Sequence, residues 1–136
     1  MPMKVHAEAL EFETRGEFDT MDLTARVDTA VRNSGIREGI AIVNTGHTTG
    51  ALILNEDEEG LQEDLKELMR RFAPAEGNYN HPNNAFAHLR SMLLSTSRVM
   101  PVHDGNLRLG TWQSIYWVET ERRPRNRIVE IAVIGS

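Results

Sequence analysis

Hydrophobic and polar residues alternate near the start of the chain, from residue 5 to residue 12. Alternation with a period of two predicts a β-strand. After a polar turn at 14–19, apolar residues recur at the spacing of one face of an α-helix. These residues are Leu23, Val27, Ala30 and Val31. We expect this helix to begin near Thr20 or Asp22, both good cap residues, and to end at Gly35, where a left-handed cap is usual.

Two short apolar runs, 40–43 and 51–54, follow the first helix, and both are suited to buried strands. The segment between them, 44–50, is polar and contains two glycines. The simplest interpretation is a pair of neighbouring strands joined by an exposed connection.

Two further helices are predicted after these runs. Apolar residues of 61–72 repeat at helical spacing behind an acidic first turn, which suits the positive end of the helix dipole, and Pro74 marks the helix end. A shorter helix is predicted at 84–94, with four apolar residues expected to face the core. They are Ala85, Leu89, Met92 and Leu93.

The remainder of the chain is predicted to be all β, with an Asp-Gly turn signal at 104–105. The strand candidates are 98–102, 106–109, 114–119 and 127–134. This order of elements predicts an α+β fold, a largely antiparallel β-sheet or sandwich packed with about three helices. A doubly wound α/β fold is disfavoured because no helices separate the last four strands. The length of 136 residues fits one domain, 1–136.

Composition narrows the class of protein. The chain has no cysteine, which excludes disulfides, thiolate metal sites and a cysteine nucleophile. Its net charge of -5 argues against binding to nucleic acid or to an anionic membrane, since both need basic surfaces. We find no apolar signal core and no apolar stretch near the roughly 20 residues of a membrane span. We therefore expect a cytoplasmic protein.

Three histidines are candidates for a shared site. His47 lies in the connection between the apolar runs, His81 in the loop after the second helix, and His88 at the edge of the third helix's expected buried face. Imidazoles from separate segments can converge on a divalent metal, with Glu56 or Asp57 supplying an oxygen ligand. No tight ligand pair such as His-x-His is present, so three separate surface or capping histidines are the alternative.

Other segments suggest an anion or heterocycle site. Thr48 and Thr49, with the glycines beside them, could surround a phosphate with hydroxyls and backbone N–H groups, although an ordinary turn explains the same pattern. The four arginines of 122–127 could bind phosphate, or could belong to a solvated turn that pairs with the acidic second helix. Trp112, beside Gln113, could hold a flat heterocycle, or could be a core or interface residue.

Together these segments resemble one known family. The matching motifs are His47-Thr48-Thr49, Leu52, Asn55-Glu56, Asp64, Tyr79, His81, His88-Leu89, Leu93-Leu94, Pro101-Val102, Asp104-Gly105 and Leu109-Gly110-Thr111-Trp112-Gln113. The last motif is the most specific. Over essentially its whole length the chain resembles the YjbQ-like family, small uncharacterised proteins also named secondary thiamine-phosphate synthase enzymes.

The resemblance implies an α+β homotrimer with a pocket that gathers histidines and holds a divalent metal, Zn or Mg. Carried over by position, the metal ligands would be His47, His88 and His81, with His81 either a ligand itself or a group that supports the ligands. Glu56 and Asp64 would be acidic partners. The catalytic candidates would be Glu56, Asp64 and His81.

The implied activity joins a pyrimidine-methyl diphosphate to a thiazole phosphate and releases pyrophosphate. Such a reaction needs a divalent cation and arginines to neutralise the leaving pyrophosphate, and an aromatic or amide wall to hold the pyrimidine. We assign the first role to the arginine run and the second to Trp112 and Gln113. The substrate-binding candidates are Thr48, Thr49, Trp112, Gln113, Arg125 and Arg127.

Two other functions fit the same residues. A metal-dependent hydrolase would use a metal-bound water, with Glu56 or Asp64 as its base. A non-catalytic trimer would bind a metal or a phosphorylated metabolite. The expected partners are therefore a small phosphorylated metabolite and further copies of this chain, without nucleic acid or membrane.

Overall fold

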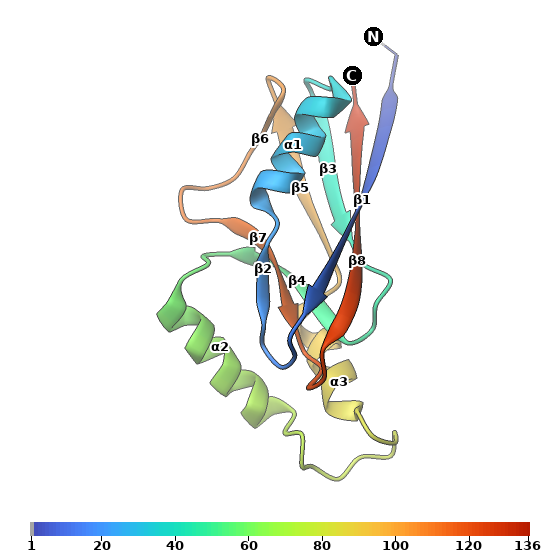
Figure 1. The fold of residues 1–136 in the computed structure, drawn as a ribbon. Coiled ribbons are helices and arrows are strands. Elements are labelled where there is room, and N and C mark those ends of the chain that lie inside the picture. Colours follow the sequence, from blue (N-terminus) through green and yellow to red (C-terminus); the bar gives the residue numbers. More distant parts are fainter. Residues whose placement is uncertain (1) are drawn as a thin grey trace.

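A computed structural model describes residues 2–136, and its first and last strands form the longest strand pair of the molecule (Figure 1). Strand β1 (Lys4–Thr14) lies antiparallel to β8 (Arg125–Gly135), and all 11 residues of each strand are paired. The two chain ends therefore lie side by side at one end of the molecule.

The strands form two antiparallel sheets. The larger sheet has the order β1-β8-β3-β5-β6, and the smaller one has the order β2-β7-β4. The remaining strands are β2 (Thr20–Asp22), β3 (Gly39–Asn44), β4 (Gly50–Asn55), β5 (Ser97–His103), β6 (Asn106–Leu107) and β7 (Ser114–Glu119). With three helices between them, these strands confirm the α+β class and its largely antiparallel character.

The helices are α1 (Thr24–Ser34), α2 (Glu59–Phe72) and α3 (Ala85–Leu94). As predicted, α1 ends at Gly35 in a left-handed cap with φ 68°. Its start lies slightly beyond the prediction, because Thr20 and Asp22 belong to β2 and Leu23 is the N-cap residue. The Asp22 carboxylate nevertheless accepts from the Thr24 N–H at 2.9 Å, as a capping side chain does. Within residues 2–136, no helix is both long enough and apolar enough to span a membrane.

The core lies between the inner face of the larger sheet, helix α1 and the smaller sheet. Four residues of α1 and its N-cap contribute to this core, as their spacing predicted. They are Leu23, Val27, Ala30 and Val31. They pack with residues of six strands, such as Val43, Ile131 and Trp117, and burial of each large aliphatic side chain contributes about 1.5–3 kcal/mol.

The two apolar runs after α1 form strands, but the prediction that these strands neighbour each other is wrong. Strand β3 pairs with β8 and β5, whereas β4 pairs with β7 in the other sheet. A short apolar run indicates burial and carries no information about its partner. Here the connection between the runs crosses from one sheet to the other.

The predicted inner face of α3 is wrong for three of its four residues, and only Ala85 is buried as predicted. Leu89, Met92 and Leu93 are 37%, 75% and 54% exposed, and the buried residues are Ala85, Phe86, Ala87, Arg90 and Ser91. The cause is Arg90, whose fully buried guanidinium lies between the rings of Phe18 and Phe86 at 4.8 and 4.9 Å from their centroids. Its Nη1 also donates to Glu17 at 2.8 Å, so a charged residue packs inward and turns the leucines outward.

Candidate functional site

The connection 45–49 between β3 and β4 is held against the start of β8 through alternate residues. The Thr45 hydroxyl donates to the Ile128 carbonyl at 2.8 Å, and the Ile128 N–H donates to His47 Nε2 at 2.9 Å. The Arg127 guanidinium donates to the Thr49 carbonyl at 2.9 Å. Because residues 45, 47 and 49 face β8, the intervening Gly46 and Thr48 are exposed.

His47 is held in one protonation state by this arrangement. A backbone N–H can only donate, so Nε2 must accept and the proton of a neutral ring lies on Nδ1. Burial, reinforced by the nearby charge of Arg127, lowers the pKa of His47 from its ordinary value. His47 therefore presents an N–H donor at Nδ1, which suits an anion, while Nε2 is occupied and is not free to ligate a metal.

A buried ion pair, which contacts Thr49, supports the connection 45–49. Glu119 and Arg127 are 0% and 3% exposed at their side chains, and they form a bidentate pair. The Glu119 carboxylate also accepts from the Thr14 hydroxyl at 2.7 Å and from the Glu121 N–H at 3.1 Å. The Arg127 guanidinium lies 5.3 Å from the Trp117 ring centroid. The position of Arg127 is thus fixed by β1, β7 and its own strand.

Two hollows of similar size lie beside this connection and along α3. The first has a volume of about 540 Å³ and is lined by 45–48, by α3 and by 95–96. The second has a volume of about 550 Å³ and is lined by 78–81 and by α3. His88 and Met92 line both hollows and form their shared wall. We call these the His47 hollow and the His81 hollow.

The structure brings the three candidate histidines to these hollows without joining them in one ligand set. His47 and His88 line the first hollow, and His81 and His88 line the second, with the rings of His81 and His88 4.7 Å apart at their centroids. Within residues 2–136, the only group of three or more potential ligand atoms within 4.8 Å of one another is elsewhere in the molecule. A metal bound by all three histidines would require their rings to move.

The other predicted site residues lie in several places. Thr48 lines the His47 hollow, and Thr49 is buried beneath it, where its hydroxyl accepts from Arg127 at 3.0 Å. Glu56, after β4, is half-buried, and Asp64 is exposed on α2. Neither acid lines either hollow.

Trp112 and Gln113 lie in the connection between β6 and β7, outside both hollows. Trp112 is 72% exposed, and the Gln113 side-chain oxygen accepts from the Gly110 N–H at 2.9 Å. Arg125 lies 3.5 Å from Glu121. Arg122 and Arg127 pair with Glu76 and Glu119, so no ion pair among the described residues joins the run 122–127 to the acidic start of α2, and that part of the solvated-turn interpretation is wrong.

A family model described as UPF0047 protein YjbQ-like matches residues 8–136. The chain belongs to the YjbQ/UPF0047 family. The UPF0047 protein of Methanothermobacter thermautotrophicus is 38% identical over 137 residues, which cover 98% of this chain and 95% of the relative. The UPF0047 protein of Archaeoglobus fulgidus is 40% identical over 128 residues, which cover 92% and 98%.

Solved structures agree with this assignment. A YbjQ-like protein of unknown function from Sulfolobus solfataricus superposes with a TM-score of 0.95 at 34% identity, covering 99% of this chain and 100% of that one. A YjbQ/UPF0047 family protein from Clostridium acetobutylicum gives a TM-score of 0.88 at 31% identity, covering 93% and 98%. The resemblance seen in the motifs is confirmed. YjbQ/UPF0047 proteins are uncharacterised, so membership by itself names no activity.

Two features of this YjbQ-family chain were missed from its sequence. Met92, predicted to be a core residue, lines both hollows. Glu119 was not singled out, although an acid directly after the apolar run 115–118, with arginines following it, is the pattern of a buried ion pair. That signal could have been found, whereas the position of Met92 depends on which face of α3 turns inward.

Proposed function

We propose that the two hollows bind two small substrates side by side, at least one of them phosphorylated, and that the protein is a thiamine-phosphate synthase-type transferase of low activity. The observation that supports this is the shared wall of His88 and Met92 between hollows of about 540 and 550 Å³. Each volume is within the range of small-molecule sites. A transferase that joins two substrates needs two adjacent subsites, so that the reacting atoms can approach.

The linings suggest which substrate each hollow takes. The His47 hollow is lined by His47 and Thr48, whose Nδ1–H and hydroxyl suit phosphate oxygens. Tyr79, His81 and Leu89 line the His81 hollow and offer aromatic and apolar surface to a flat heterocycle. We therefore assign the thiazole phosphate to the first hollow and the pyrimidine-methyl diphosphate, with its ring against the aromatic surface, to the second.

The proposal includes a divalent ion, Zn²⁺ or Mg²⁺, that neutralises the diphosphate leaving group when bound. The ring pair of His81 and His88 fits Zn²⁺, whereas Mg²⁺ prefers oxygen and would take most of its ligands from the diphosphate and water. His47 does not fit as a third ligand, because its Nε2 accepts from Ile128. We assign His47 to anion binding instead.

The experiment supplies purified protein with the pyrimidine-methyl diphosphate and the thiazole phosphate. Thiamine phosphate and pyrophosphate are measured together, because the transfer forms them in equal amounts. His88→Ala, which removes the shared wall, should abolish product. His6→Ala is the matched control, since His6 lies on β1 outside both hollows. Equal activity in His88→Ala would contradict the proposal.

A non-catalytic binding role is the second candidate, and one observation favours it. Among the described residues, no Asp or Glu lines either hollow, so neither contains a carboxylate base. Binding of both phosphorylated compounds in calorimetry, without product, would support this role. Absence of both binding and product would exclude the two candidates together.

We also propose that the protein is a homotrimer located in the cytoplasm. The outer face of the larger sheet supports self-association, because two successive cross-strand rows are entirely apolar. Each row crosses β1, β8, β3 and β5 in that order. The first row is Val5, Ile134, Ile40 and Pro101, and the second is Ala7, Ala132, Ile42 and Val99. Exposures of 71%, 40% and 56% for Val5, Ile40 and Val99 leave an apolar patch of the kind that marks an interface. The number three comes from the family resemblance.

The molar mass of the protein, measured by light scattering as it elutes from a size-exclusion column, tests this assembly. The wild type should have about three times the mass of the chain, and Val99→Lys should reduce it to one chain. Lys66→Ala, on α2 and outside the larger sheet, is the matched control. A monomeric wild type would refute the proposal.

A further inference from the structure

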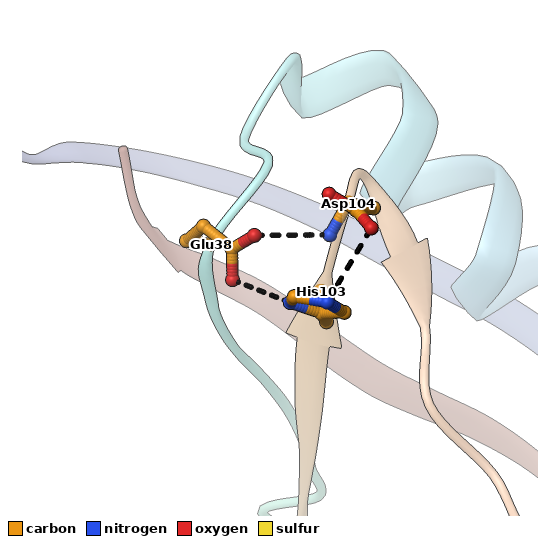
Figure 2. A group of neighbouring side chains, drawn as sticks. All are labelled: Glu38, His103 and Asp104. Atoms are coloured by element: carbon orange, nitrogen blue, oxygen red, sulfur yellow. Dashed lines mark hydrogen bonds and ion pairs between the residues drawn. The ribbon is translucent and has the colours of Figure 1, made fainter.

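A histidine and two carboxylates come together at the end of the molecule opposite α3 (Figure 1, Figure 2). Glu38 directly precedes β3, His103 ends β5, and Asp104 lies in the turn to β6. Each of the three offers a ligand atom, and these atoms lie within 4.8 Å of one another. His103 Nδ1 is 2.9 Å from a Glu38 oxygen, and Nε2 is 3.3 Å from an Asp104 oxygen.

The backbone beneath this cluster is fixed. Asp104 and Gly105 have φ values of 52° and 77°, which is the pattern of a type I′ hairpin turn. The Gly105 N–H donates to the Arg37 carbonyl at 3.0 Å, which ties the turn to the segment before β3. Glu38 and Ser136 exchange two backbone hydrogen bonds of 3.0 and 3.1 Å. The three side chains therefore start from positions that the fold has already set.

Two carboxylates meet one imidazole and one arginine in this cluster. Its only nearby permanent cation among the described residues is Arg37, whose guanidinium is 3.5 Å from Asp104 and 69% exposed at its side chain. The hydrogen bond from His103, followed by the one from the Asp104 N–H, lowers the pKa of Glu38 from its ordinary value. One imidazole faces two carboxylates, and a divalent ion would balance both.

We propose that Glu38, His103 and Asp104 bind a divalent transition-metal ion of the zinc class, at a site separate from the two hollows. One imidazole nitrogen with carboxylate oxygens suits Zn²⁺ and its neighbours in the first transition row, while oxygen alone would favour Mg²⁺. The side chains are 56%, 52% and 66% exposed, so water completes the coordination and the affinity is modest. The ion would connect the segment before β3 to the β5–β6 turn.

Zinc titration by calorimetry tests the site in a background that removes the other histidine pair, His81→Ala with His88→Ala. This background should bind one Zn²⁺ per chain. Adding His103→Ala should weaken binding at least about tenfold, as loss of a ligand exceeds the 10–100-fold effect of losing a supporting group. Adding His6→Ala, the matched control, should leave the affinity unchanged. No zinc binding by the background, or equal affinity in the two triple variants, would overturn the proposal.

A second measurement locates the ion. In amide spectra of the same background protein, Co²⁺ should broaden the resonances of Gly105 and Asn106 first, because they adjoin the cluster. The exposed substitution His103→Ala should leave the metal-free melting temperature unchanged and abolish this broadening. Broadening confined to other residues would refute the location.

Discussion

Removal of the Glu119 carboxylate perturbs the connection 45–49 through its buried support. In Glu119→Ala the Arg127 guanidinium stays buried without a counter-charge, and the Thr14 hydroxyl and the Glu121 N–H each lose an acceptor. Removal of one partner of a buried ion pair costs about 3–5 kcal/mol. This is a large part of the roughly 5–15 kcal/mol by which a domain is stable.

The expected change in melting temperature follows from the chain length. A domain of 136 residues has an unfolding entropy of about 0.29 kcal/mol per kelvin near 60 °C, so the melting temperature should fall by about 10–17 °C. Calorimetry and urea denaturation measure the loss. Glu67→Ala is the control, because this carboxylate is exposed and 4.0 Å from Arg71; its melting temperature should change by less than about 2 °C.

A double variant separates lost charge balance from lost packing. Glu119→Leu with Arg127→Met removes both charges at similar volume, and replacement of a buried ion pair in this way is often neutral or stabilising. The double variant should therefore recover most of the stability that Glu119→Ala loses. A loss below about 1 kcal/mol in Glu119→Ala, or a double variant as unstable as the single one, would refute the reasoning.

Two further predictions concern the same connection. Because burial and Arg127 lower the pKa of His47, its contribution to stability is complete above the unfolded value of about 6.5 and is lost as pH falls toward the folded value. His47→Gln, which keeps an acceptor but does not titrate, should therefore lose less stability than wild type between about pH 7.5 and 5.5 in urea denaturation; parallel losses would contradict this. The Cβ of Gly50→Ala would overlap the Trp117 ring and should cost about 1–3 kcal/mol, measured by denaturation followed through tryptophan fluorescence. Gly46→Ala meets nothing within 4 Å and should be neutral, and equal effects of the two alanines would show that this packing is wrong.

Sequence periodicity located most elements, because each has one face in contact with the core. The α1 stripe at Leu23, Val27 and Ala30 is buried as predicted, and the strand predicted at 114–119 has the same bounds in the structure. Periodicity reports which residues are buried, so it left the partners of β3 and β4 undetermined. It was also wrong for α3, where aromatic and acidic groups from distant segments hold Arg90 inside.

The candidate site was predictable in part for the same reason. Family-type motifs pointed to His47, His81 and His88, and the structure places them around two adjacent hollows. The role of His47 depends on the N–H of Ile128, 81 positions away in the chain. No local pattern records such a bond, so the choice between metal ligand and anion donor needed the tertiary structure.

The pairing of β1 with β8 has a consequence for the order of folding. During synthesis β1 leaves the ribosome before the other described strands, and its partner, residues 125–135, is made more than a hundred residues later. Until then β1 has no hydrogen-bonding neighbour in its sheet, because β8 is its only partner there within residues 2–136. Pairings so distant in sequence fold slowly, and an unpaired strand can associate with other chains. We expect this strand to need protection by a chaperone until synthesis has passed residue 135, and truncation before β8 to give an aggregating product.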